Sequence, residues 1–234
     1  MQLQTTANSI NERSRFVDAL RIHTAWTASY EKRLLLWLAR HTPGSINPDH
    51  LTAVALVAQV FAGAAYALAS HNARALWLVN LFLVLNWLGD SLDGTLARVR
   101  NQQRPRYGFY VDHIVDAFGA LALMTGLGCS GYLHWPIATA MLLCFYLLSI
   151  ESYLATYAIG QFHISHGLFG PTEIRILLIV GNAFLGSHKY VSIAGRHLLL
   201  FDVAGVVAII GMTVMAGSAV ARHTLLLYRE EPRQ

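Results

Sequence analysis

Charged residues are scarce in this chain. Of its 234 residues, 13% are Asp, Glu, Lys or Arg, whereas 55% are hydrophobic. A soluble domain of this size carries about twice that charged fraction, so the composition favours an integral membrane protein. The basic residues lie between apolar stretches and form no patch or tail. This distribution argues against a nucleic-acid partner and favours anionic lipid headgroups and phosphate-bearing substrates.

Cysteine and paired histidine are scarce as well. The two cysteines, Cys129 and Cys144, each lie in an apolar run with no CxxC or zinc-like spacing. The eleven histidines are scattered without an HxxxH pair. No metal site built on Cys or His is therefore predicted. The first 28 residues are polar and mixed in charge, so no cleavable signal peptide is expected.

Six apolar stretches are present, each expected to cross about 30 Å of hydrocarbon. They cover residues 51–70, 75–98, 108–130, 136–159, 174–185 and 198–227, and the fifth is the shortest. Their apolar residues run continuously, without the period-two alternation of barrel strands, so helices are expected. The sequence thus predicts an all-α membrane protein with six transmembrane helices.

An amphipathic segment precedes the first of these spans. Residues 29–41 read SYEKRLLLWLARH, with apolar side chains at helical spacing and basic residues nearby. This pattern predicts an interfacial helix on the membrane surface, with a soluble amphipathic helix as the alternative. The chain then divides into an N-terminal cytoplasmic segment with this juxtamembrane helix (1–44), a six-helix domain (45–228) and a C-terminal tail (229–234).

The positions of Lys and Arg predict the orientation. With six spans, both termini and the loop after the second span lie on one side, and most basic residues fall there. The opposite loops hold Arg74, Lys189 and Arg196. The termini and the polar ends of the second and third spans are therefore expected to face the cytoplasm, in a multi-pass protein of a bacterial cell membrane.

Four aspartates lie at the cytoplasmic ends of the second and third spans. Asp90 and Asp93 are three residues apart, and Asp112 and Asp116 are four apart, so each pair shares a helix face. A short loop makes the two helices antiparallel neighbours, which predicts that the carboxylates converge. Such carboxylates repel one another unless a cation lies among them. Oxygen ligands alone favour Mg²⁺ or Mn²⁺, and four carboxylates suffice for two ions that clamp a diphosphate. The alternative is a set of buried carboxylates paired with arginine for stability.

Small residues accompany the aspartates. Gly94, Ala97 and Gly108 leave room for a nucleotide to approach the backbone. Arg98 supplies a guanidinium that is able to bind phosphate through two hydrogen bonds. This combination is more typical of a nucleotide-diphosphate site than of a structural charge cluster.

These residues resemble the signature of the CDP-alcohol phosphotransferase family. That signature reads DxxDGxxAR, a spacer, then GxxxDxxxD, and its spacer here has nine residues. Every fixed position is matched, by Asp90, Asp93, Gly94, Ala97, Arg98, Gly108, Asp112 and Asp116. The segment Asn47-Pro48-Asp49-His50-Leu51-Thr52 is similar to the family's NPN-x-x-T-type start. The resemblance covers about residues 45–228.

The resemblance implies a six-helix fold, usually a homodimer, with a cavity open to the cytoplasm. Asp90, Asp93 and Asp112 would be the core metal ligands. Asp116 would be the general base and also a ligand of the second ion. The CDP site would be lined by Pro48, Asp49, Thr52, Gly94, Ala97, Arg98 and Gly108. The implied reaction is attack by an alcohol hydroxyl on the β-phosphate of a CDP-activated lipid, with CMP leaving.

The acceptor alcohol is less well defined. Arg175 and Arg222, at the cytoplasmic ends of the fifth and sixth spans, favour an acceptor that carries phosphate. The alternative is that both arginines are positive-inside anchors. Glu151, inside the fourth span, either has a function or bonds a Ser or Tyr of a neighbouring helix.

Two other functions are kept as alternatives. In the first, CDP-choline or CDP-ethanolamine donates to diacylglycerol, since Val111-Asp112-His113 is similar to the Phe-Asp-His of such enzymes. In the second, the carboxylates form the pathway of a cation transporter. Clustering at one membrane face disfavours the transporter, because transporters spread such residues over several spans.

Overall fold

A computed structural model describes residues 28–159, 171–185, 188–193 and 195–231. The elements, in chain order, are α2 (Ala28–His41), α3 (Pro48–Ala69), α4 (Ala75–Val99), α5 (Pro105–Cys129), α6 (Trp135–Ile159), α7 (Pro171–Leu185), β1 (Tyr190–Ile193), β2 (Arg196–Leu199) and α8 (Leu200–Glu230). The predicted all-helical class is confirmed. A short antiparallel hairpin, β1–β2, lies between α7 and α8 and was not predicted.

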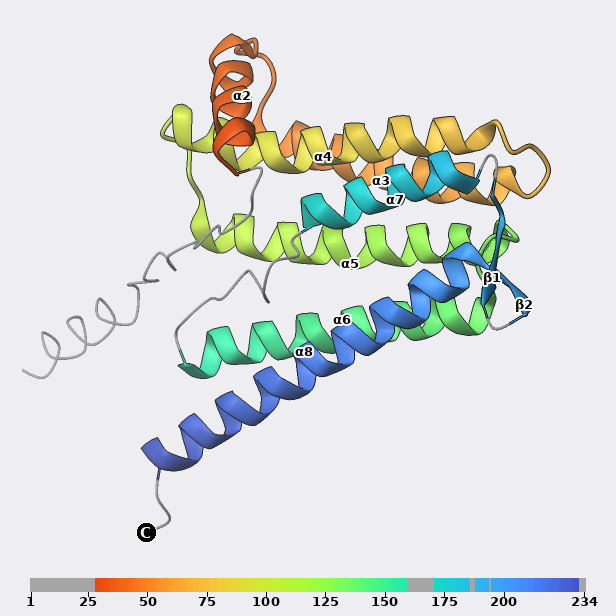
Figure 1. Cartoon of the computed structure of the whole chain (residues 1–234). Coiled ribbons are helices and arrows are strands. Elements are labelled where there is room, and N and C mark those ends of the chain that lie inside the picture. The colour runs from red at the N-terminus through yellow and green to blue at the C-terminus, as the bar shows by residue number, and fades with distance from the viewer. Residues whose placement is uncertain (1–27, 160–170, 186–187, 194, 232–234) are drawn as a thin grey trace, which may run out of the picture.

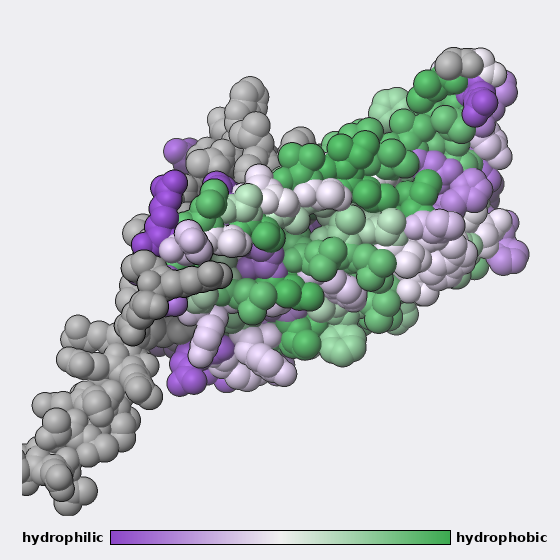
Figure 2. All heavy atoms as spheres, turned by 90° about the horizontal axis from the view of Figure 1, so that it is seen from below, coloured by the Kyte–Doolittle hydropathy of each residue, from purple (hydrophilic) through white to green (hydrophobic). Residues whose placement is uncertain are grey.

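Among the described residues, five helices are long and apolar enough to cross a membrane: α3, α4, α5, α6 and α8. The fifth predicted span corresponds to α7, which has 15 residues. At 1.5 Å per residue this helix is about 22 Å long, which is shorter than the roughly 30 Å of hydrocarbon. Figure 2 shows hydrophobic side chains over the middle of the visible face and hydrophilic ones toward both ends. Five candidate spans and this distribution identify a multi-pass membrane protein.

The helices α3, α4, α5 and α7 lie side by side, and α6 and α8 form a pair beyond α5 (Figure 1). The contact between α3 and α5 depends on glycine. A Cβ atom added at Gly126 would lie 1.9 Å from the backbone oxygen of Gly63, and one added at Gly63 would lie 2.3 Å from that of Ala122. Only hydrogen side chains permit this approach. The resulting close crossing fixes α5 relative to the helices beside it.

The start of α3 is set by its first residues. Asn47 is the N-cap, Pro48 follows at the first helical position, and the backbone N–H of Asn47 donates to His50 Nδ1 at 3.3 Å. Proline suits this position because its missing N–H would have no partner in the helix. The polar segment that resembles a family motif is therefore a helix start, and its side chains face the ends of α4 and α5.

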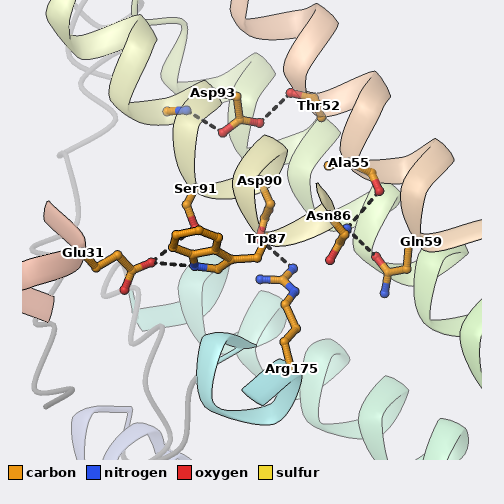
Figure 3. Close-up of polar contacts among 11 residues, drawn as sticks. Glu31, Thr52, Ala55, Gln59, Asn86, Trp87, Asp90, Ser91, Asp93 and Arg175 are labelled. Carbon is orange, nitrogen blue, oxygen red and sulfur yellow. Dashed lines mark hydrogen bonds and ion pairs between the residues drawn. The ribbon is translucent and has the colours of Figure 1, made fainter. Parts of the chain in front are cut away.

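The helix α2 runs across the end of α4 (Figure 1). Its Leu35 and Ala39 are buried against Leu92 and Leu96 of α4. Glu31 Oε1 accepts hydrogen bonds from Trp87 Nε1 at 3.0 Å and from Ser91 Oγ at 3.4 Å (Figure 3). A helix thus forms at the predicted place and is tied to α4. Its position on a membrane surface stays a prediction.

Candidate active site

The two aspartate pairs lie on neighbouring helices, near the ends that the loop 100–104 connects. Asp90 and Asp93 belong to α4, and Asp112 and Asp116 belong to α5. Asp93 and Asp112 line the same pocket. Asp116 is within electrostatic reach of the other three carboxylates. The four aspartates predicted to converge therefore lie near one another in the structure.

Asp93 is the most buried of the four, with 7% of its surface exposed. Its Oδ2 accepts a hydrogen bond of 2.6 Å from Thr52 Oγ1, and its Oδ1 accepts one of 2.5 Å from the backbone N–H of Gly94 (Figure 3). Buried carboxylates require such donors, because desolvation of the charge is otherwise costly. The first contact joins the start of α3 to the aspartate helix.

Asp90 has an arginine partner from a distant part of the sequence. Arg175 Nη2, near the start of α7, lies 2.8 Å from Asp90 Oδ2 (Figure 3). The arginine side chain is 11% exposed and the aspartate side chain 34% exposed, so this is a largely buried ion pair. Asp116 is also within electrostatic reach of Arg175. Arg175, predicted as an acceptor ligand, therefore lies among the carboxylates.

A pocket opens beside Asp93 and Asp112, between the starts of α3 and α5 and the end of α4. Its lining includes six of the seven residues predicted to bind CDP, namely Pro48, Asp49, Thr52, Gly94, Ala97 and Gly108. The seventh, Arg98, is exposed, and its Nη2 donates to Thr95 Oγ1 of the same helix at 3.0 Å. The pocket thus has a carboxylate end and a wall of small residues, a form that suits a phosphorylated ligand.

Several lining residues were not predicted from the sequence. Gln102, Arg104, Tyr107 and Val111 also line the pocket. Arg104 pairs with Asp49, and its guanidinium lies 4.0 Å from the centre of the Tyr107 ring. The hydrogen bond to Asp49 raises the pKa of Arg104. Their place in the sequence could have indicated them. Residues of the spacer connect the two halves of the signature, so they must lie near the same ends of α4 and α5 as the aspartates.

The other acceptor candidate, Arg222, is exposed at the end of α8. Its Nε donates to Ser218 O of the same helix at 3.4 Å. The neighbouring His223 instead faces α6, where its Nδ1 lies 2.5 Å from Glu151 Oε1. Glu151 therefore bonds a neighbouring helix, as one of the two alternatives stated, but its partner is a histidine.

The aspartates supply the type of donor that a divalent metal ion needs. Carboxylate oxygens from two facing helices have the chemistry that Mg²⁺ and Mn²⁺ prefer. Within the described ranges, however, no three His, Cys, Asp or Glu side chains are grouped closely enough to hold a metal ion. Asp90 is directed to Arg175, and Asp93 is directed to Thr52. The residues fit a divalent cation by type, and to hold one the carboxylates would have to move closer together and Asp90 would have to leave Arg175.

Comparison with known proteins gives two findings. The family model described as CDP-alcohol phosphatidyltransferase matches residues 45–223. A protein of Aquifex aeolicus (strain VF5), described as uncharacterized, is 34% identical over 118 residues. That alignment covers 48% of this chain and 58% of the relative, so the chain spans little more than half of the relative's length. The matched family range contains the pocket and all four aspartates.

Proposed function

The chain belongs to the CDP-alcohol phosphatidyltransferase family, and on that premise we propose that it transfers a phosphatidyl group from CDP-diacylglycerol to a polar alcohol and releases CMP, in phospholipid synthesis. The observation that carries this proposal is the pocket in which Asp93 and Asp112 meet Gly94, Ala97 and Gly108. The small residues leave space near the backbone for a nucleotide. The carboxylates would hold the cations that a diphosphate needs, and the membrane setting of the helices gives access to a lipid substrate.

In the proposed reaction, the acceptor hydroxyl oxygen forms a bond to the β-phosphorus of the CDP-lipid. The bond from that phosphorus to the oxygen bridging the two phosphates breaks, and CMP leaves with its electrons. Asp116 accepts the hydroxyl proton in this scheme. It lies one helical turn from Asp112, which lines the pocket, and within electrostatic reach of the other carboxylates. A carboxylate placed there suits general-base catalysis, since proton removal is needed only as the new bond forms.

We further propose Mg²⁺ or Mn²⁺ as cofactor, with two ions held by Asp90, Asp93, Asp112 and Asp116. When bound, the ions would neutralise the diphosphate and stabilise the leaving CMP. Thr52 would then have two roles. It lines the proposed CDP site, and its hydroxyl orients the Asp93 carboxylate. The exposed side chain of Arg98 lies beside Gly94. From this position it is able to turn toward a phosphate in the pocket.

The CDP-binding role is proposed for Pro48, Asp49 and Thr52 on α3 and for Gly94, Ala97, Arg98 and Gly108 on α4 and α5. The small residues are essential to this assignment. A Cβ added at Gly108 would meet no atom within 4 Å, so the space beside it is open to a ligand. By contrast, glycines at helix crossings such as Gly63 have no free space.

We propose that α7 is a sixth membrane-embedded segment, although it is short. Its Asn182 is 2% exposed, accepts a hydrogen bond from Tyr66 of α3 at 2.9 Å and donates to Asn80 of α4 at 2.8 Å. Two turns away along the same helix, Arg175 pairs with Asp90. These contacts hold α7 along α4 for most of its length. Both termini and the site would then face the cytoplasm of a bacterial cell, with α2 on the membrane surface.

The acceptor is proposed to carry phosphate. Arg175 is beside the carboxylates, and an acceptor phosphate that reached it would find a charge-assisted hydrogen-bond donor. Arg222 would contribute only after leaving its contact with Ser218. A homodimer is proposed from family membership together with the exposed apolar side chains of α6 and α8, which include Leu147, Leu154 and Val207.

One experiment tests the function and its alternatives. Purified protein in detergent receives CDP-diacylglycerol with a panel of glycerol phosphate, inositol phosphate, serine and no acceptor, and CMP release is measured with Mg²⁺ present. A second series supplies CDP-choline or CDP-ethanolamine with diacylglycerol. Acceptor-dependent CMP in the first series supports the proposal. CMP only in the second series would reverse the lipid role, and no CMP in either would contradict transfer altogether.

A further inference from the structure

Arg100 makes three hydrogen bonds to backbone oxygens of a single connection. It caps the end of α4, at a spacer position where the signature has no fixed residue, and its guanidinium reaches the segment between α2 and α3. Nη1 donates to Ile46 O at 2.6 Å, and Nη2 donates to Thr42 O and Pro43 O, both at 2.9 Å. Three carbonyls within five residues thus share one arginine.

The connection has few other means of holding its shape. The last turn of α2 is closed by its own side chains, since Thr42 Oγ1 donates to Leu38 O at 2.8 Å and His41 Nδ1 lies 2.7 Å from Trp37 O. Beyond that turn, Ile46 N donates to Pro43 O at 3.1 Å. The remaining carbonyls need donors, and a planar guanidinium offers several in a fixed geometry that an ammonium group lacks.

This connection leads directly into the pocket. Asn47 follows Ile46 as the N-cap of α3, and Pro48, Asp49 and Thr52 then line the pocket wall. On the other side of Arg100, Gln102 and Arg104 line the same pocket. The arginine therefore joins the two chain segments that enclose the nucleotide side of the site.

The hydrogen bond between Thr52 and Asp93 gives a second fixed point. Asp93 and Arg100 are seven residues apart, which places them on one face of α4 two turns from each other. One holds the first turn of α3 and the other holds the connection before it. The ion pair between Asp49 and Arg104 adds a contact within the first turn of α3. Loss of the Arg100 hydrogen bonds would therefore release the connection before α3, while α3 itself stays packed on α4.

We propose that Arg100 is a positioning residue for nucleotide binding, which acts by holding the α2–α3 connection so that Pro48, Asp49 and Thr52 form a fixed wall of the pocket. This role rests on the proposed function, because it takes the pocket to be the CDP site. Arg100 contacts no substrate in this scheme. Its loss acts on the nucleotide end of the site and leaves the carboxylate end unchanged.

The test compares Arg100→Ala, Arg100→Lys and a control, Arg106→Ala, in the full-length protein in detergent. Arg106 is an exposed arginine of the same region, and it makes no hydrogen bond or ion pair within the part of the chain that the structure describes. CDP is titrated in Mg²⁺ by calorimetry, and KM for CDP-diacylglycerol and for the acceptor are measured separately. The midpoint of thermal unfolding is followed with and without Mg²⁺.

Arg100→Ala is expected to weaken CDP binding about tenfold and to raise KM for CDP-diacylglycerol by a similar factor. The acceptor KM and the effect of Mg²⁺ on the unfolding midpoint should stay unchanged. Arg100→Lys should fall between the alanine variant and the unaltered protein, because one ammonium group cannot reproduce the three-bond geometry. Arg106→Ala should bind CDP normally. A purely structural defect would instead lower CDP and Mg²⁺ responses together.

Three results would overturn the proposal. Arg100→Ala could bind CDP as tightly as the unaltered protein, or Arg106→Ala could lose as much affinity, which would make the effect one of general positive charge. If Arg100→Ala does not fold, Arg100→Lys decides, and normal CDP binding by that variant would also reject the role. Failure of the unaltered protein to bind CDP at all would reject the proposed function on which the role depends.

Discussion

Arg175 and Asp90, 85 residues apart in the sequence, form an ion pair with 2.8 Å between Nη2 and Oδ2. The pair joins α7 to the helix that carries the first half of the signature. The sequence left two interpretations of the aspartates open, a metal site and a structural pairing with arginine. Asp90 has features of both, since it belongs to the family motif and is paired with an arginine. A metal ion that binds Asp90 therefore has to compete with the guanidinium of Arg175.

Replacing Arg175 with alanine is expected to destabilise the protein by about 1–3 kcal/mol, because it leaves a partly buried carboxylate without its partner. Thermal unfolding in detergent at low ionic strength would measure this. Addition of Mg²⁺ should restore more stability in Arg175→Ala than in the unaltered protein, since the competing cation is gone. An identical unfolding midpoint and Mg²⁺ response in both proteins would show that the pair has no such role. Arg222→Ala is a suitable control for stability, because its hydrogen bond stays within α8.

Arg175→Ala should also raise the acceptor KM while CDP binding stays the same, if the acceptor carries phosphate. The expected rise corresponds to about 1.5–3 kcal/mol of acceptor binding, the value of a hydrogen bond to a charged group. Steady-state kinetics with the acceptor found in the CMP-release panel would measure it. An unchanged acceptor KM would restrict Arg175 to the pairing of Asp90 and reopen the neutral or amine-bearing acceptors.

Activity is expected to require a divalent cation and Asp112. EDTA should abolish CMP release, and Mg²⁺ or Mn²⁺ should restore it. Asp112→Asn should remove nearly all turnover, because it withdraws a proposed shared ligand. Asp202→Asn is the matched control, since Asp202 accepts from the backbone of His134 at the other end of the bundle. Full activity in EDTA would exclude the metal.

Asp116→Asn is expected to lower kcat far more than it weakens CDP-lipid binding. Proton removal contributes only in the transition state, so loss of the base leaves ground-state binding intact. Binding of CDP by calorimetry, measured beside kcat, separates the two effects. Equal losses in binding and in turnover would make Asp116 chiefly a metal ligand.

The close crossing of α3 and α5 gives a prediction about stability. Gly126→Ala should destabilise the protein by about 1–3 kcal/mol or more, because the new methyl group would overlap the backbone of Gly63. Gly217→Ala, on α8, is the control, as a Cβ there meets no atom within 4 Å. That change should be neutral or slightly stabilising. Equal unfolding midpoints for the two variants would contradict the crossing.

Much of this structure follows from local pattern. Continuous apolar runs predicted the positions of α3 to α6 and α8 closely, because burial in lipid is a property of each segment by itself. The aspartate spacing grouped four residues that also lie together in space, because a short loop leaves two helices no other arrangement. The fixed positions of the signature and the NPN-type segment together contain eight of the residues that line the pocket.

The remaining features depend on how distant segments meet, which local pattern does not contain. Arg175 faces Asp90 because α7 packs along α4, and a sequence of apolar runs does not specify that neighbour. Arg100 and Arg104 were counted only as positive-inside charges, although one holds a connection and the other pairs with Asp49. The hairpin β1–β2 was missed because its four-residue strands are too short for a periodic signal.

The hydrogen bonds of Asn182 have a consequence for how the protein is made. An amide side chain is costly in hydrocarbon, and a helix of 15 residues has little apolar length with which to offset that cost. Under the six-segment proposal, α7 would enter the bilayer poorly as an isolated segment. Tyr66 and Asn80, which satisfy the amide, belong to helices that leave the ribosome earlier. Under that proposal, the order of synthesis would supply the binding surface before the segment that needs it, and α7 would insert against an already formed pair of helices.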